Sequence, residues 1–229
     1  MNFKNPRMLG NPVQSAKIFN ARGVDELVFL DILASKQNRK INLSVVKKVI
    51  DECFMPVSIG GGITTLEDIH DLLKIGADKV VIKSQALKKP EFVSEASKIF
   101  GSQCITIAID VEKNENHYMI YNEFGLDVEV VKFIEEMQHF GAGEFIINSV
   151  DEDGRMNGFD IELFRYVSQN CHVPIVFCGG AGEPSHFKDL FLSTECNSVG
   201  AASIFSFTQY TPLDIKHTIR SIGKPVRID

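Results

Sequence analysis

The chain has 229 residues, of which 44% are hydrophobic and 24% are charged, and its formal net charge is −6. This length and composition predict an ordinary globular chain with one sizeable core, which we expect to be a single domain over residues 1–229. The acidic balance, without a block of Lys or Arg, argues against nucleic acid as a partner. No apolar run is long enough to span a membrane, and the N-terminus lacks the apolar segment of a secretory signal, so we expect a cytoplasmic protein.

Cysteine and histidine usage gives no sign of a metal centre. The five cysteines have no C-x-x-C or histidine-paired spacing, and the six histidines fall in predicted helices or loops rather than at strand ends. We therefore expect reduced thiols, no metal site and no cofactor.

Apolar periodicity and capping signals predict that helices and buried strands alternate along the chain. Helices are expected over 11–22, 42–52, 64–74, 90–100, 127–140, 160–169, 184–192 and 212–221. Strands are expected over 26–32, 55–60, 77–87, 104–110, 144–150, 173–178 and 197–205. A polar excursion follows Asp110. This alternation with short connections indicates a parallel α/β fold.

Two copies of one stretch organise the sequence. MPVSIGGGI begins at Met55 and VPIVFCGGAG begins at Val173, an offset of 118 residues, and the match extends without a gap over 25–87 and 143–205. Two equal halves favour a closed (βα)8 TIM barrel over an open doubly wound sheet. The repeat also predicts that the partner of strand 104–110 lies upstream of Met1. Either the native chain starts earlier, which we expect, or the barrel lacks its first strand.

Polar residues and glycines stand at the predicted strand ends, where parallel barrels carry their working groups. Adjacent glycines after a buried strand let backbone N–H groups approach an anion, although a plain tight turn is the alternative. Asp110 is the candidate for proton transfer, or else it caps the following turn. Asp31 is a second candidate, or else it only positions the first. Lys83 is either a phosphate ligand or a solvated lysine at the rim.

These motifs resemble a known family. DELVFLDILAS, MPVSIGGGI, ADKVVIKSQAL, ITIAIDVEK, GAGEFIINSVDEDGRMNGFD, VPIVFCGGAG and GAASIF are similar to the cyclase subunit of imidazole glycerol phosphate synthase, along essentially the whole chain. The resemblance implies a (βα)8 barrel lyase of histidine biosynthesis. Such a barrel takes ammonia from a class I glutaminase docked on the opposite face. It uses that ammonia to close the imidazole ring of a bis-phosphorylated nucleotide.

The resemblance also implies roles for individual residues. The acid/base pair of the family consists of Asp110 and an aspartate that ends the first strand, and the second of these has no counterpart in this sequence. Asp31 is the other catalytic candidate, from its place at a strand end. The phosphate sites are Gly61, Gly62, Lys83 and Ser84 at one end, and Gly154, Gly179, Gly180, Ala202 and Ser203 at the other. Lys83 replaces the usual asparagine, and the loop after Asp110 is shorter than in the cyclases. The ammonia entrance is Glu26, Lys79 and Glu144, for which ordinary salt bridges are the alternative.

A second branch is similar in phrases such as ECFMP, IFGSQ and KIFNARGVDELVFLDI. This branch comprises the cyclase-like barrels of surface-polysaccharide loci. There the resemblance implies an ammonia conduit, with reduced catalysis, that pairs with a glutaminase and supplies a sugar amidotransferase. The residue that distinguishes the branches lies in the missing strand. The sequence therefore leaves open the pathway, the acceptor sugar and the affinity for the partner.

Overall fold

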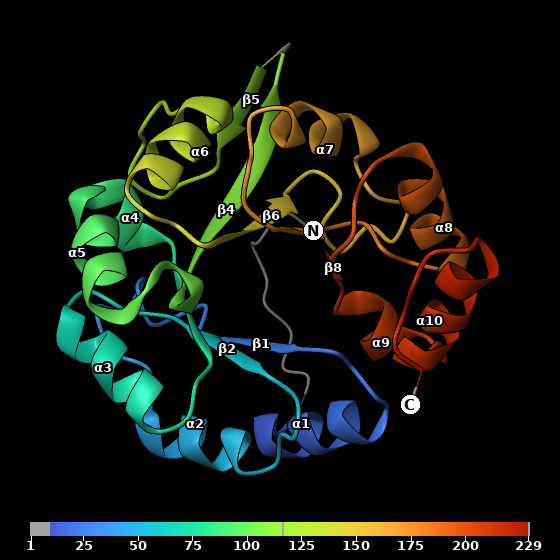
Figure 1. Ribbon diagram of the computed structural model, residues 1–229, viewed down its shortest axis with the longest axis horizontal. Coiled ribbons are helices and arrows are strands. Elements are labelled where there is room, and N and C mark those ends of the chain that lie inside the picture. Colours follow the sequence, from blue (N-terminus) through green and yellow to red (C-terminus); the bar gives the residue numbers. More distant parts are fainter. Residues whose placement is uncertain (1–9, 116, 229) are drawn as a thin grey trace. The chain divides into compact units, whose positions relative to one another are not determined.

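The structure is a computed structural model that describes residues 10–115 and 117–228 (Figure 1). Its described residues form two compact units. One, called the N-terminal unit, comprises 10–108 and 136–144, and the other, the C-terminal unit, comprises 109–135 and 145–228. The expectation of a single domain over residues 1–229 stays a prediction. The expectation of a strand upstream of Met1 also stays a prediction.

The N-terminal unit alternates helices with parallel strands. Its elements are α1 (Pro12–Ala21), β1 (Leu27–Leu30), α2 (Leu43–Ile50), β2 (Val57–Gly60), α3 (Leu66–Lys74), β3 (Lys79–Ile82), α4 (Ser84–Lys88), α5 (Glu91–Phe100) and the start of β4 (Ile105–Asn114), with a 3-10 turn at Ser102–Cys104. The strands pair in parallel in the order β1-β2-β3-β4. Every residue of β2 is buried, as expected of a parallel strand covered on both faces.

The C-terminal unit continues the pattern and adds a hairpin. Its elements are the rest of β4, β5 (His117–Ile120), the start of α6 (Val130–His139), β6 (Glu144–Ser149), α7 (Ile161–Ser168), β7 (Ile175–Cys178), α8 (Pro184–Ser193), β8 (Val199–Gly200), α9 (Ser203–Phe207) and α10 (Pro212–Ser221). The parallel strands follow the order β4-β6-β7-β8, and β5 pairs antiparallel with the extended end of β4. This hairpin, visible in Figure 1, is the predicted polar excursion after Asp110.

Phenylalanines fill the core of the C-terminal unit. The rings of Phe159 and Phe187 meet edge to face with centroids 5.2 Å apart, and those of Phe164 and Phe177 do so at 5.3 Å. Phe145 and Phe177 are fully buried. Edge-to-face pairs of this kind add to the free energy of area burial and fix how α7 and α8 pack on the sheet.

Two predicted strands are shorter than expected. The strand predicted over 77–87 ends at Ile82, and the one over 197–205 ends at Gly200, because each is followed by a short helix, α4 or α9. The chain leaves the extended conformation at Lys83 (ψ −78°) and at Ala202 (ψ −53°). Apolar periodicity does not separate a buried strand from the short helix that continues its apolar run. Both errors fall at equivalent points of the repeat.

The alternation and the strand order are those of a (βα)8 TIM-barrel-type α/β fold, as predicted. The repeat is visible in the glycines that end β2 and β7. Gly61 has φ +120°, and a Cβ there would lie 2.6 Å from the carbonyl oxygen of Asp31. Gly179 has φ +98°, and a Cβ there would lie 2.7 Å from the carbonyl oxygen of Ser149. Only glycine fits this close approach between neighbouring strand ends in each half. No helix among the described residues has the length and apolar character needed to cross a bilayer.

Candidate functional site

Five polar residues gather where the strands of the N-terminal unit begin, and we call them the strand-start cluster. Lys79 is the first residue of β3, Glu144 is the first of β6, and Glu26 precedes β1. The Lys79 Nζ donates to Glu26 Oε2 at 3.0 Å and to Glu144 Oε2 at 2.8 Å. The remaining carboxylate oxygens accept hydrogen bonds from hydroxyl groups, Ser58 Oγ at 2.5 Å for Glu26 and Thr106 Oγ1 at 3.0 Å for Glu144. The result is a continuous chain of polar contacts across the strand starts.

The strand-start cluster is partly shielded from solvent. The exposed fractions of its charged side chains are 22% for Lys79, 29% for Glu26 and 14% for Glu144, while both hydroxyl residues are fully buried. Burial disfavours the ammonium charge, but the hydrogen bonds to Glu144 and Glu26 outweigh it, and the pKa of Lys79 is raised. Lys79 therefore stays charged between two carboxylates, and the cluster carries one net negative charge.

The sequence predicts that Glu26, Lys79 and Glu144 lie together at the strand starts, but it does not identify Ser58 and Thr106 as part of the cluster. Ser58 and Thr106 are each the second residue of a strand and lie inside apolar runs, VSIG and ITIA. A buried hydroxyl group requires a hydrogen-bond partner. A lone hydroxyl residue in an otherwise apolar strand therefore indicates that a polar partner lies nearby, and this signal could have identified both residues.

Asp31, predicted as a catalytic candidate, directly follows β1, and its carboxylate forms an ion pair with Arg39 of the β1–α2 loop. Arg39 donates to both of its carboxylate oxygens, at 2.5 and 3.0 Å, and Leu33 N donates to Oδ1 at 3.2 Å. The hydrogen bonds from Arg39 lower the pKa of Asp31 and outweigh its partial burial. A bidentate pair of this kind fixes a carboxylate rigidly. This ion pair favours the alternative given in the sequence analysis, in which Asp31 positions other groups rather than transferring protons.

Of the predicted phosphate residues of the N-terminal unit, Gly61 and Gly62 lie beside Asp31 and Arg39. A Cβ on Gly62 would lie 2.3 Å from the carbonyl oxygen of Arg39, so Gly62 lets the β1–α2 loop pack against the end of β2. Lys83 is the N-cap of α4, whose first helical residue is Ser84, and no side chain caps this helix start. Helix starts of this kind present backbone N–H groups that attract anions.

In the C-terminal unit, Asp110 lies with Asn148 and Asp153, and we call these three residues the Asp110 group. Asn148 Nδ2 donates to Asp110 Oδ1 at 3.1 Å, which orients this carboxylate within β4, directly before the part of the strand that pairs with β5. Asp153 is in the loop after β6, where its backbone N–H donates to the carbonyl oxygen of Ser149 at 2.9 Å. Burial, followed by the negative charge of Asp110, raises the pKa of Asp153. One carboxylate is thus oriented by an amide, and the other is shifted toward its protonated form.

Asn148 and the loop 151–154, which contains Asp153, are expected at a strand end from the sequence, but the sequence assigns no role to either residue. The segment DEDG reads as a charged loop, and nothing in its composition distinguishes Asp153 from its acidic neighbours. Their position directly after a strand end was the usable signal, because catalytic groups of parallel barrels lie there.

The other phosphate residues predicted for the C-terminal unit lie at its strand ends and in the loop that follows β6. Gly180 has a positive φ, and a Cβ there would lie 1.8 Å from the carbonyl oxygen of Gly158, whose N–H donates to the carbonyl oxygen of Gly180 at 2.9 Å. Gly154, in the same loop, also has a positive φ and has open space around it. Ala202 and Ser203 begin α9, which has no side-chain cap.

Cys178 lies at the end of β7. Burial raises the pKa of its thiol to about 12, which disfavours the thiolate and argues against a nucleophilic role. Among residues 10–115 and 117–228, no group of three His, Cys, Asp or Glu residues could hold a metal ion.

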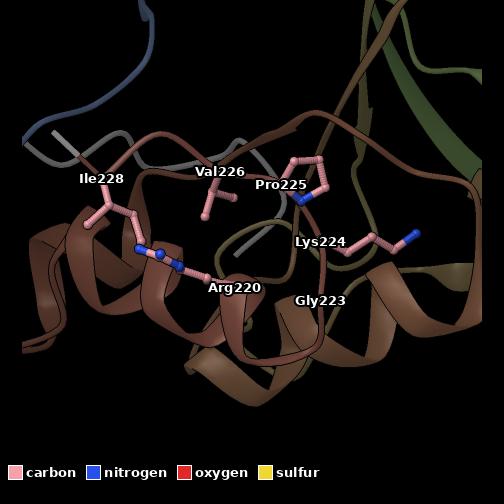
Figure 2. A pocket seen from close by; sticks show the side chains of 6 residues that line it. All are labelled: Arg220, Gly223, Lys224, Pro225, Val226 and Ile228. Atoms are coloured by element: carbon pink, nitrogen blue, oxygen red, sulfur yellow. The ribbon is translucent and has the colours of Figure 1, made fainter.

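An open pocket lies at the segment that follows α10. It has a volume of about 600 Å³ and is lined by residues of the C-terminal segment, as Figure 2 shows: Arg220, Gly223, Lys224, Pro225, Val226 and Ile228. The side chains of Arg220 and Lys224 point in opposite directions (Figure 2), so they do not converge on one anion. No predicted site residue lines this pocket.

The comparison with protein families agrees with this architecture. A family model described as histidine biosynthesis protein matches residues 1–211 of the 229-residue chain. Members of this family are TIM-barrel enzymes of histidine biosynthesis, and the cyclase resemblance of the sequence motifs points to the same family. With nearly its whole length matched and the (βα)8-type strand order in place, the chain belongs to the histidine biosynthesis protein family.

Proposed function

We propose that the chain is a cyclase subunit of the imidazole glycerol phosphate synthase type. It would use ammonia from a glutaminase partner to close the imidazole ring of a bis-phosphorylated nucleotide, a lyase reaction. The observation that carries this proposal is the Asp110 group, in which an oriented carboxylate and a half-buried carboxylate of raised pKa lie in one unit. An oriented carboxylate beside a second carboxylate whose pKa is raised is suited to general acid–base catalysis.

In the proposed reaction these carboxylates have different tasks. Asp110, aligned by Asn148, accepts a proton from the nitrogen nucleophile as the nitrogen forms its new bond to carbon. Asp153 is the group better suited to donate a proton to the oxygen or nitrogen that leaves, because burial favours its neutral form. This division supplies a second acid/base group from residues that are present in the described chain.

The strand-start cluster supports ammonia as the nitrogen source. In this proposal Glu26, Lys79 and Glu144 form the ammonia entrance. Lys79 is held by two carboxylates from β6 and from the residue before β1, which are two strands away from β3 on either side. Its partial exposure leaves it accessible to a small molecule. Ammonium is attracted to carboxylate oxygens, and an entering ammonia molecule can exchange hydrogen bonds with the same groups.

Both ends of the substrate would be held by backbone groups. We assign one phosphate to Gly61, Gly62, Lys83 and Ser84, and the other to Gly154, Gly179, Gly180, Ala202 and Ser203. The uncapped starts of α4 and α9 and the positive-φ glycines support this assignment. Such elements present N–H groups to an anion without a side chain in the way.

The test is turnover of the bis-phosphorylated nucleotide with ammonium salts as the nitrogen source, which requires no glutaminase. Asp110→Asn should abolish turnover while leaving nucleotide binding intact, as measured by calorimetry. Asp189→Asn, which changes an exposed carboxylate on α8, is the matched control and should retain activity. Turnover of Asp110→Asn equal to that of the wild type would remove Asp110 from the mechanism.

A second candidate function is an ammonia conduit that supplies a sugar amidotransferase of surface-polysaccharide biosynthesis. The observation that favours it is the bidentate Arg39 pair, which occupies both oxygens of Asp31 and so removes that carboxylate from acid–base work. In that case the wild-type chain would not turn over the nucleotide. Glutaminase activity would instead rise only when the barrel and the amidotransferase are both present.

A further inference from the structure

The segment 179–182, which follows β7 and which we call the β7 loop, is held by a histidine that the proposed reaction does not use. His186, in the first turn of α8, accepts a hydrogen bond at Nδ1 from the backbone N–H of Gly182 at 3.1 Å. The side chain of His186 is 17% exposed, so its ring is largely enclosed by the C-terminal unit. The same loop carries Gly179 and Gly180, to which one phosphate of the substrate is assigned.

The direction of this hydrogen bond determines the form of the imidazole. Because Nδ1 of His186 accepts, it carries no proton, and the neutral ring has its hydrogen on Nε2. Glu183 Oε1 lies 3.9 Å from Nε2, which is beyond hydrogen-bond distance, and it accepts a hydrogen bond from the hydroxyl group of Ser185. The bond from Gly182, rather than the charge of Glu183, therefore relates this ring to the β7 loop.

The β7 loop packs closely against the segment 154–158, which follows β6. A Cβ on Gly182 would lie 2.1 Å from the carbonyl oxygen of Met156, and Gly158 N donates to the carbonyl oxygen of Gly180 at 2.9 Å. Met156 has φ +62°, a conformation that residues with a side chain seldom adopt and that persists only where the surrounding structure holds it. The two segments therefore constrain each other's backbone.

The start of α8 contacts both segments. A Cβ on Gly158 would lie 3.8 Å from Cδ2 of His186. The next residue on each side, Phe159 and Phe187, meet edge to face with ring centroids 5.2 Å apart, and Phe187 is 2% exposed. His186 thus meets the β7 loop through a hydrogen bond and the neighbouring segment through its ring, from a helix that the aromatic core holds in place.

We propose that His186 is the positioning residue of the phosphate site in the C-terminal unit. Its Nδ1 fixes the peptide between Ala181 and Gly182, and so fixes the direction of the amide groups that the β7 loop presents to a phosphate. This inference rests on the proposed function, in which Gly179 and Gly180 bind one phosphate. His186 touches no phosphate itself. Without its hydrogen bond, the ligand would have to order the loop on binding, which lowers affinity.

The test compares two substitutions of similar size in calorimetric titrations with the bis-phosphorylated nucleotide. His186→Leu removes the acceptor and should weaken binding about tenfold, the factor that the loss of one hydrogen bond can cause. His186→Asn carries an acceptor oxygen on Cγ, the atom to which Nδ1 is attached, and should bind within about threefold of the wild type. The control is His217→Ala, which removes an exposed histidine of α10 and should bind like the wild type.

Steady-state kinetics with ammonium salts distinguish positioning from a general loss of structure. In His186→Leu the loss should fall on KM more than on kcat, because the loop acts on binding of the phosphate rather than on the chemical step, and His186→Asn should restore KM. Three results would overturn the positioning role: a loss mainly in kcat, binding by His186→Asn as weak as that of His186→Leu, or binding by His186→Leu equal to that of the wild type.

Titration with inorganic phosphate separates this inference from the cyclase proposal. In NMR spectra, the amide signals of Gly179 and Gly180 report this site apart from the phosphate site of the N-terminal unit. If the wild type shows no turnover but its loop signals respond to phosphate, more weakly in His186→Leu and normally in His186→Asn, the cyclase proposal fails and the positioning role stands. Wild-type turnover with equal phosphate responses in all three proteins would retain the cyclase proposal and overturn the positioning role, as would loop signals that do not respond in the wild type.

Discussion

Replacing Lys79 with methionine should destabilise the chain because it leaves two carboxylates facing each other without their shared cation. Removing one partner of a buried ion pair costs about 3–5 kcal/mol, whereas exposed pairs contribute about 0.2–1 kcal/mol. The side chains of Lys79, Glu26 and Glu144 are 22%, 29% and 14% exposed, between these limits. Both glutamates keep hydrogen bonds from hydroxyl groups. We therefore expect Lys79→Met to lower the free energy of unfolding by about 2 kcal/mol.

Urea unfolding at several pH values measures this loss. The pKa of Lys79 is raised in the folded chain, so its stabilising charge is fully present below the unfolded pKa of about 10.4 and is lost as the pH rises through the higher folded value. The loss caused by Lys79→Met should therefore be the same at pH 7 and pH 9. Adding Glu144→Gln should recover part of it. If Lys79→Met lowers the free energy of unfolding by less than about 0.5 kcal/mol, or if the double variant recovers none of the loss, the three charged residues do not stabilise one another as proposed.

Three further predictions concern the strand ends. Arg39→Gln should lower stability at pH 7 in urea unfolding but not at a pH below the folded pKa of Asp31, because that pKa is depressed and its contribution disappears as the carboxylate is protonated. An equal loss at both pH values would contradict this. The pKa of Asp153 is raised, so its charge costs stability as the pH rises through that pKa, and Asp153→Asn should raise the thermal midpoint at pH 8 more than at pH 4. Gly179→Ala should cost about 2 kcal/mol or more, since φ is +98° and a Cβ would lie 2.7 Å from a carbonyl oxygen; unchanged urea unfolding would show that the turn relaxes.

The order of elements could be predicted from the sequence because apolar runs and capping residues are local signals. Thr65 and Asp68, for example, form the capping box that begins α3. The boundaries of β3 and β8 could not be predicted, because the helices that follow them continue the same apolar character. The extent of β4 also differed, since its polar end pairs with β5 and a polar strand carries no burial pattern.

The site was predictable only in part, for a similar reason. Glu26 and Glu144 occupy equivalent repeat positions, so the sequence places both at strand starts. Contacts between distant residues have no local signature: Asn148 orients Asp110 from 38 residues away. The Arg39 pair depends on how the β1–α2 loop folds back on Asp31. The expected roles of these residues came from the resemblance to the cyclases, whereas their hydrogen-bond partners became visible only in the folded chain.

The most direct test of the central claim is the rate at which the wild-type chain and Asp110→Asn convert the bis-phosphorylated nucleotide with ammonium salts. We predict measurable wild-type turnover and a loss of at least about 100-fold in the variant, the effect expected when a general acid–base group is removed. No turnover by the wild type would contradict the assignment of this chain as a cyclase, and equal rates for the two proteins would remove Asp110 from its mechanism.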